Sequence, residues 1–289
     1  MKPNKYISTY KKFLEKSVNI SRPLRVFVDA GNGTTGPIIE SLKIQNLSLT
    51  IINKKPDGNF PSHSPNPNSL PSLTFKKKLY DFGVAFDGDG DRAVFFDEEG
   101  KKISPHKIAY LLFLKEKPPF VADPIIRALF LYSHLSTSDI YESIVGSPHI
   151  KSAMRKINAS VGAEYSGHYY FKSCFGFDSG IFAFLQCAQV ISKLPYSLKT
   201  FSSLLGEPII METMQYEAKN HEHSIRSARA LFHNMAEGMV EKDGISFFFN
   251  STFLYIRPSH TESIIRVYII AHEKQKANHI KNMVHDLFE

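Results

Sequence analysis

The chain has 289 residues, of which 43% are hydrophobic and 22% charged, a composition typical of a globular protein. Its formal charge of +7 favours anionic partners, but the basic residues form no long stripe, which argues against nucleic-acid binding. The sequence shows neither a membrane-spanning apolar run nor a signal-peptide core, so we expect no membrane partner and a cytoplasmic location. In that reducing environment, Cys174 and Cys187 are expected to be reduced thiols packed in the protein interior.

The first third of the chain predicts a β-α-β unit of the parallel α/β kind. A helical stretch from Tyr6 to Leu14 leads into it, and a glycine-rich turn at 30–36 precedes a helix with Pro37 in its first turn. Residues 55–71 contain five prolines and no periodicity, so we expect a loop there. The four expected strands lie over residues 24–29, 47–52, 82–86 and 93–96.

The remainder predicts two further units. Helices and strands alternate from 105 to about 204, beginning with a helix whose N-cap is Ser104 and including an apolar helix over 180–192. In the final block, strands are expected near 209–216 and 264–271, and helices near 222–236 and 274–288. We therefore predict an α/β protein of tandem three-layer α/β domains with mixed sheets, followed by a C-terminal α+β domain with an antiparallel sheet and helices on one face. The expected domains span residues 1–104, 105–205 and 206–289.

Three aspartates alternate with glycines in the hexapeptide Asp87-Gly-Asp-Gly-Asp-Arg92. Glycines let the backbone turn tightly, so the carboxylates of Asp87, Asp89 and Asp91 are expected to converge as ligands of a hard cation of the Mg²⁺ or Ca²⁺ type. An EF-hand is the first alternative, because Glu98 falls at loop position 12. However, Arg92 stands where an EF-hand requires glycine, and the flanks predict strands. The pattern therefore favours a catalytic Mg²⁺ site over an EF-hand or a merely solvated acidic turn.

This hexapeptide resembles the metal loop of the α-D-phosphohexomutases. The segments at 28–33 and 57–67 are similar to second-domain elements in the bacterial phosphomannomutase/phosphoglucomutase branch of that family. The resemblance implies that Asp87, Asp89 and Asp91 hold Mg²⁺. It also implies that Arg92 contacts the phosphoryl group in catalysis.

The segment Ala163-Glu-Tyr-Ser-Gly-His168 resembles the family's sugar loop. The resemblance implies that Glu164 and Ser166 bind sugar hydroxyls and that His168 braces them from behind. A carboxylate accepts two hydroxyl donors and a serine can donate in return, a combination that suits neighbouring sugar hydroxyls.

The segment Arg257-Pro-Ser-His-Thr-Glu-Ser263 is similar to the family's phosphate-binding loop. The resemblance implies that Arg257, Ser259 and Thr261 bind the substrate's non-reacting phosphate, for which an arginine fork and two hydroxyls are well suited. Because one hexose phosphate must touch both loops, we expect these residues to share a cleft with Glu164 and Ser166.

The resemblance covers residues 5–289 and implies that the family's first domain, which carries the phosphorylated serine, is missing. Ser62-His63 imitates the nucleophile loop of that domain but lies in the second-domain region, so we interpret Ser62 as a loop residue. The sequence departs from the family's motifs at four further places. The strand near 121–126 has no basic residue, and the other three departures are Ser147 in place of His, Ala163 in place of Gly, and Ser263 in place of Pro.

Three functional hypotheses remain open. The chain is a mutase component for mannose or glucose 1- or 6-phosphate that needs Mg²⁺ and a separate serine-domain polypeptide, a non-catalytic sugar-phosphate binding protein, or an inactive remnant. A hexose phosphate is the expected ligand in the first two. Alone, the chain is expected to show no mutase turnover, because nothing in it takes the role of the nucleophile.

Overall fold

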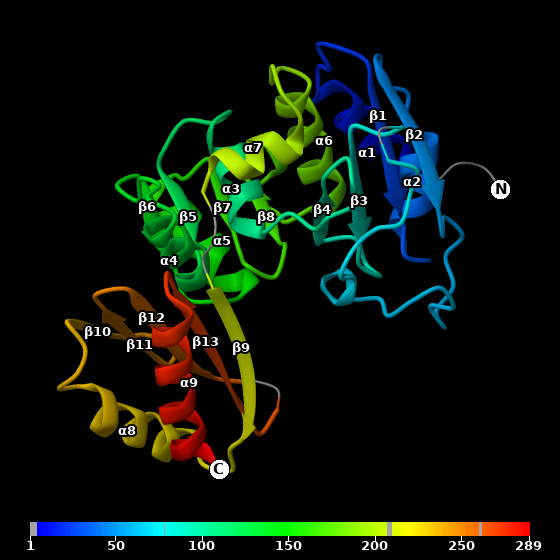
Figure 1. The fold of residues 1–289 in the computed structure, drawn as a ribbon. Coiled ribbons are helices and arrows are strands. Elements are labelled where there is room, and N and C mark those ends of the chain that lie inside the picture. The colour runs from blue at the N-terminus through cyan, green and yellow to red at the C-terminus, as the bar shows by residue number, and fades with distance from the viewer. Residues whose placement is uncertain (1–4, 78, 207–209, 260–261) are drawn as a thin grey trace.

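Three β-sheets follow one another along the chain in the computed structural model, which describes residues 5–77, 79–206, 210–259 and 262–289 (Figure 1). The first two sheets are mixed and the third is antiparallel. The predicted fold class, tandem α/β domains followed by an α+β domain, is confirmed. In the described part of the chain, no helix combines the length and apolarity needed to cross a bilayer.

The first sheet has the strand order β2-β1-β3-β4, in which β1 pairs in parallel with β2 and β3, and β4 pairs antiparallel with β3. Its strands are β1 (Leu24–Asp29), β2 (Leu47–Ile52), β3 (Phe82–Phe86) and β4 (Ala93–Phe96). The helices of this part are α1 (Lys5–Lys16), α2 (Thr35–Ser41) and the 3₁₀ turn η1 (Pro67–Ser69). Val26 and Val84 point to the helical face, whereas Phe27 and Ala85 face Leu73 in the loop after η1, as the two-residue period of a strand requires.

The second sheet has the order β6-β5-β7-β8 and is covered on both faces. Val121 and Tyr170 pack on α5, and Phe120 and Tyr169 belong to the large core that α6 shares with the first sheet. The strands are β5 (Phe120–Ala122), β6 (Ile140–Glu142), β7 (Val161–Ala163) and β8 (Tyr169–Phe171). The helices are α3 (Pro105–Phe113), α4 (Pro124–Tyr132), α5 (Ser147–Ile157), α6 (Gly180–Ile191), α7 (Leu198–Leu204) and the 3₁₀ turn η2 (Lys172–Cys174).

Two details of this part bear on the sequence expectations. Ser104 occupies the N-cap position of α3 as predicted, but its hydroxyl does not cap the helix backbone. It lies 2.8 Å from the Nδ1 atom of the buried His106 side chain instead. Cys174 and Cys187 are free, buried thiols, as expected.

The third sheet is antiparallel in the order β10-β11-β12-β13-β9. Its strands are β9 (Ile210–Glu217), β10 (Gly238–Glu241), β11 (Ile245–Phe249), β12 (Thr252–Pro258) and β13 (Ile264–Ala271), and its helices are α8 (His221–Phe232) and α9 (Lys274–Phe288). Both helices cover one face, as predicted (Figure 1). On the other face, Phe253, Tyr255 and Ile270 pack against α4, which joins the third sheet to the second. The three strands β10 to β12 were not predicted from the sequence.

Candidate functional site

The acidic loop at 87–92 follows the buried strand β3, which fixes where it begins. Gly90 has φ +84, and a Cβ there would meet Thr35 Cγ2 at 2.4 Å, so both the turn and the packing require glycine. The glycine-rich turn at 30–36 supports the loop, because Thr34 N donates to Gly88 O at 2.9 Å and Thr34 Oγ1 donates to Asp89 O at 2.9 Å. The turn therefore has a structural role.

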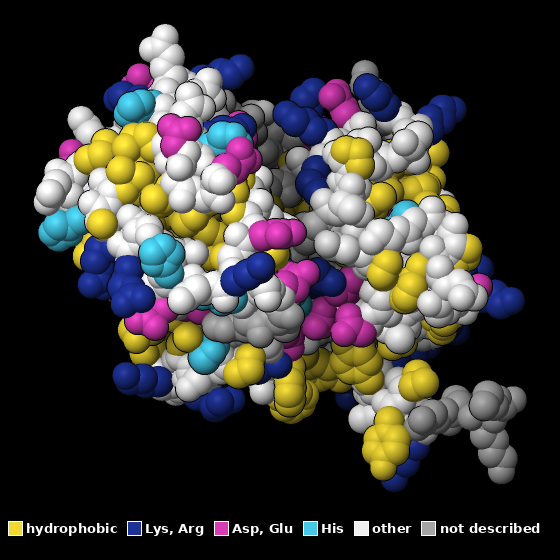
Figure 2. Space-filling view, turned by 90° about the horizontal axis from the view of Figure 1, so that it is seen from below, with side chains coloured by type: hydrophobic (Ala, Val, Ile, Leu, Met, Phe, Trp, Pro, Cys, Tyr) yellow, Lys and Arg dark blue, Asp and Glu magenta, His cyan; other side chains and the backbone are white. Residues whose placement is uncertain are grey.

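Carboxylate oxygens of Asp87, Asp89 and Asp91 all lie within 4.8 Å of one another. This separation is about the distance between two oxygens on opposite sides of a hard cation with bonds of roughly 2.1 to 2.5 Å. Three carboxylates form an oxygen-only donor set, which fits Mg²⁺ or Ca²⁺. On the face shown in Figure 2, acidic side chains gather in a hollow near the middle of the molecule.

Asp87 is the buried member of the three and is held by its own loop. The amide groups of Gly90 and Arg92 donate to Asp87 Oδ1 at 3.0 and 3.1 Å, and Arg92 Nε donates to Asp87 Oδ2 at 2.6 Å. Burial raises the pKa of Asp87 to about 6, against the lowering effect of the Arg92 hydrogen bond. These bonds fix the side chain of Arg92, the last residue of the loop, and its Nη1 lies 3.4 Å from Asn66 Oδ1.

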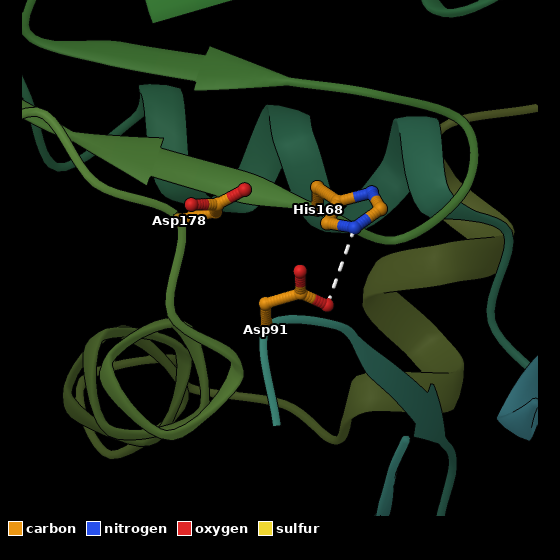
Figure 3. Close-up of side chains that lie close together, drawn as sticks. All are labelled: Asp91, His168 and Asp178. Atoms are coloured by element: carbon orange, nitrogen blue, oxygen red, sulfur yellow. Dashed lines mark ion pairs between the residues drawn. The ribbon is translucent and has the colours of Figure 1, made fainter. Parts of the chain in front are cut away.

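The sugar loop is joined directly to this acidic loop. Arg92 and His168 form an isolated antiparallel bridge, and Ala93 N donates to Gly167 O at 3.1 Å. His168 Nε2 lies 3.2 Å from Asp91 Oδ1, as Figure 3 shows. The hydrogen bond from His168 lowers the pKa of Asp91 to about 2. Burial of His168 disfavours its charged form, but the carboxylates of Asp91 and Glu164 together outweigh that effect, so the pKa of His168 is raised. The other ring nitrogen, Nδ1, is 2.7 Å from Ser166 Oγ.

A third side chain, Asp178, completes the group drawn in Figure 3 and comes from the loop before α6. Its ligand oxygen lies within 4.8 Å of donor atoms of Asp91 and His168. However, Lys151 Nζ is 2.7 Å from Asp178 Oδ1, and Ser147 Oγ donates to Oδ2 at 3.1 Å. Because the lysine already balances its charge, Asp178 is a weaker candidate metal ligand than the loop aspartates. Asp178 was not predicted as a site residue from the sequence.

Glu164 points into the protein. It is 2% exposed, accepts from Gly146 N at 2.6 Å through Oε1, and accepts from the Tyr170 hydroxyl through Oε2. Asp123, at the N-terminus of α4, holds the same loop by accepting from Tyr165 N at 2.7 Å. Sequence reasoning missed Asp123, although an Asp followed by Pro124 is a recognisable helix start.

The phosphate-loop residues lie at the end of β12. Arg257 is 9% exposed and donates through Nε to Asp243 Oδ2 at 2.9 Å, and Ser259 is 4% exposed with its amide bonded to Ile264 O at 2.9 Å. Thr261 lies outside the described residues. Arg257, Ser259 and Glu164 are each buried in this structure. The expectation that these side chains share one cleft with Ser166 stays a prediction.

One cavity does lie between the three sheets, with a volume of about 560 Å³. Ser166 lines it, and the pocket extends over polar residues from all three parts of the chain. Asn68 Nδ2 donates to Ser166 O at 2.6 Å, which ties the first part of the chain to the sugar loop at the cavity wall.

Ser62 has none of the geometry of an activated nucleophile. Its hydroxyl donates to Asn32 Oδ1, and the neighbouring His63 places Nε2 3.1 Å from Asp29 Oδ2 and Nδ1 2.7 Å from Ser64 O. Since both ring nitrogens of His63 are engaged elsewhere, the imidazole is not placed to take a proton from Ser62.

Three successive family models match this chain. They are described as phosphoglucomutase/phosphomannomutase alpha/beta/alpha domain II over residues 4–100, alpha/beta/alpha domain III over 114–210, and the C-terminal domain over 214–287. A phosphomannomutase of Escherichia coli K12 is 30% identical over 278 residues, 85% of this chain and 58% of that protein. A phosphomannomutase of Methanocaldococcus jannaschii is 28% identical over 303 residues, 96% of this chain and 65% of that protein.

Solved structures agree on the fold. A phosphoglucomutase/phosphomannomutase family protein from Burkholderia thailandensis superposes with a TM-score of 0.78 at 22% identity, covering 97% of this chain and 63% of that one. An Aspergillus fumigatus N-acetylphosphoglucosamine mutase, solved with GlcNAc-6P and magnesium, gives a TM-score of 0.67 at 14% identity and covers 97% of this chain and 64% of that one. The chain thus spans about three fifths of the length of these relatives. From its three consecutive domain matches, this chain belongs to the phosphoglucomutase/phosphomannomutase family.

Proposed function

We propose that this chain binds hexose phosphates together with Mg²⁺ and supplies the metal, hydroxyl and phosphate contacts of a phosphohexomutase. The phosphoryl-carrying serine would come from a separate serine-domain polypeptide. The observation that carries the proposal is the direct link between the acidic loop and the sugar loop, through Asp91, His168 and Ser166. That link supports the proposal, because transfer of a phosphoryl group to a sugar requires metal ligands and hydroxyl contacts close to one another.

Each of the candidate site residues would have its own role in phosphoryl transfer. Asp87, Asp89 and Asp91 would hold the cation, whose chemistry there is to neutralise charge on a transferring phosphoryl group. Asp87 also fixes Arg92, whose remaining N–H groups are free of that carboxylate and can bind phosphoryl oxygens. His168 would carry a proton on its imidazole ring, which contacts Asp91 through Nε2 and Ser166 through Nδ1. Ser166 would orient a sugar hydroxyl.

The test is a mutase assay with mannose 1-phosphate, with and without a separately expressed phosphorylated serine domain of this family. We expect turnover only when both polypeptides and Mg²⁺ are present. Ser62→Ala is the matched control and should not change that turnover. Robust activity of the chain alone, abolished by Ser62→Ala, would overturn the proposal.

A second function, non-catalytic binding of sugar phosphates, is favoured by the departures from the family's pattern, which include Ser147, Ala163 and Ser263. Calorimetric titration with mannose 6-phosphate separates this case, because binding without turnover in the complemented assay supports it. Absence of both binding and turnover supports an inactive remnant.

A further inference from the structure

The cavity between the three sheets contains an unusual lysine. Lys102 lies just before α3, and its side chain lines the cavity with its ammonium donating to Asn68 O at 2.7 Å. In the described part of the chain, no carboxylate lies within 4.0 Å of this ammonium. Burial lowers the pKa of Lys102, because the protein replaces much of the water that would solvate its charge.

The remaining wall of the cavity is uncharged and combines polar groups with the apolar surfaces of Pro105 and Tyr165. Asn66, Asn68 and Ser166 line it from the first two parts of the chain, and Thr213 and Tyr268 line it from the third. Thr213 and Tyr268 are directly opposed on strands β9 and β13, so the third sheet contributes them as one pair. Among the described residues that line the cavity, none is acidic and Lys102 is the one cation. Such a wall suits an anion that carries hydroxyl groups, and its single positive charge disfavours cations.

Two hydrogen-bonded links connect this cavity with the candidate catalytic residues. Asn66 Oδ1 lies 3.4 Å from Arg92 Nη1, and Ser166 leads through His168 to Asp91. The volume of about 560 Å³ lies within the range of roughly 300 to 1,000 Å³ that is usual for small-molecule sites. A ligand seated here would reach Lys102 and Ser166 together, since Asn68 bonds to both.

We infer that Lys102 is an anion-binding residue of this cavity and that it receives the phosphate of a sugar phosphate whose hydroxyls lie against Ser166. No segment of the sequence that resembles the family's motifs includes Lys102. The inference rests on the proposed function for the identity of the sugar, but the cationic site itself follows from the cavity.

The test compares Lys102→Gln with Lys101→Gln, which removes the same charge from an exposed neighbour. Calorimetric titrations use mannose 6-phosphate and, separately, inorganic phosphate. We expect Lys102→Gln to weaken binding about tenfold or more and Lys101→Gln to leave it nearly unchanged, because only the half-buried ammonium makes a direct charged hydrogen bond. Lys102→Arg should retain most of the affinity.

A second measurement on the unaltered chain does not depend on how the variants fold. Acetylation of lysines, read by mass spectrometry, should be slowed at Lys102 by mannose 6-phosphate and unchanged at Lys101. Mannose 6-phosphate binding that is insensitive to Lys102→Gln, or that leaves Lys102 unprotected, would overturn the Lys102 site while the proposed function stands. Lys102-dependent binding of inorganic phosphate without any binding of mannose 6-phosphate would keep the site and overturn the proposed function. Binding of neither anion would overturn both.

Discussion

Asp123 offers a sharp test of how the sugar loop is held. Its side chain is 1% exposed and accepts from Ile126 N at the start of α4 and from Tyr165 N in the sugar loop, both at 2.7 Å. Burial raises its pKa from an ordinary value of 3.8 to about 7, against the lowering effect of the two amide hydrogen bonds. Glu164 adds to the rise and Arg257 opposes it.

The sign of the pH dependence follows from proton linkage. The folded chain holds the Asp123 proton up to about pH 7, whereas the unfolded chain releases it near the ordinary value of 3.8. The folded state therefore binds more protons in that window, and the free energy of unfolding falls as the pH rises through it. A pKa difference of this size corresponds to about 4 kcal/mol between the two ends of the window.

Asp123→Asn is the informative change, because asparagine imitates the neutral carboxylic acid and does not titrate. Its amide can still accept at one position but places a donor near the other amide, so we expect a loss of about 1 to 3 kcal/mol at low pH. The stability advantage of the unaltered chain over the Asp123→Asn variant should then shrink as the pH rises from about 4, and it should reverse by about pH 7, because the loss of about 4 kcal/mol exceeds it. Chemical unfolding followed by far-UV circular dichroism suits a chain without tryptophan.

Asp139→Asn provides the control, since Asp139 is an exposed carboxylate in the same part of the chain. A stability difference between the unaltered chain and the Asp123→Asn variant that stays constant across this pH range would refute the reasoning. The same pH-dependent change in the Asp139→Asn variant would show that the effect comes from the change in net charge and not from burial of Asp123.

Three further predictions concern the site. Asp89→Asn should weaken Mg²⁺ binding about tenfold or more with little effect on unfolding, because Asp89 is an exposed member of the acidic loop; an unchanged Mg²⁺ titration would contradict this. Arg257→Met should destabilise the chain by about 3 to 5 kcal/mol, because it removes the ion pair between Arg257 and the buried carboxylate of Asp243, and Arg257→Lys should recover only part of that loss; equal unfolding midpoints for all three proteins would speak against it. The chain alone should convert mannose 1-phosphate no faster than background even with Mg²⁺ and a hexose 1,6-bisphosphate, and turnover that survives Ser62→Ala would point to an unidentified nucleophile.

Local pattern decided much of the fold. Runs of β-branched and aromatic residues placed β1 to β4 at their observed positions, and the glycine-aspartate alternation at 87–91 indicated converging carboxylates without any knowledge of the sheet. These features depend on residues close together in the chain, whose conformations are set by backbone sterics and short-range packing. Strands β11 and β12 were missed because their apolar runs are nearly continuous, which leaves the short turn between them without a clear signal.

The direction of individual side chains was decided only by tertiary structure. Nothing in the sequence shows that Glu164 turns inward to Gly146 and Tyr170, that Arg257 pairs with Asp243, or that Lys102 lines a cavity. Each of these contacts joins segments that are brought together by the packing of whole elements, and a buried polar group takes whichever partner that packing supplies. The residue types of the candidate site were therefore readable from the sequence, whereas their partners and their exposure were set by the arrangement of the three sheets.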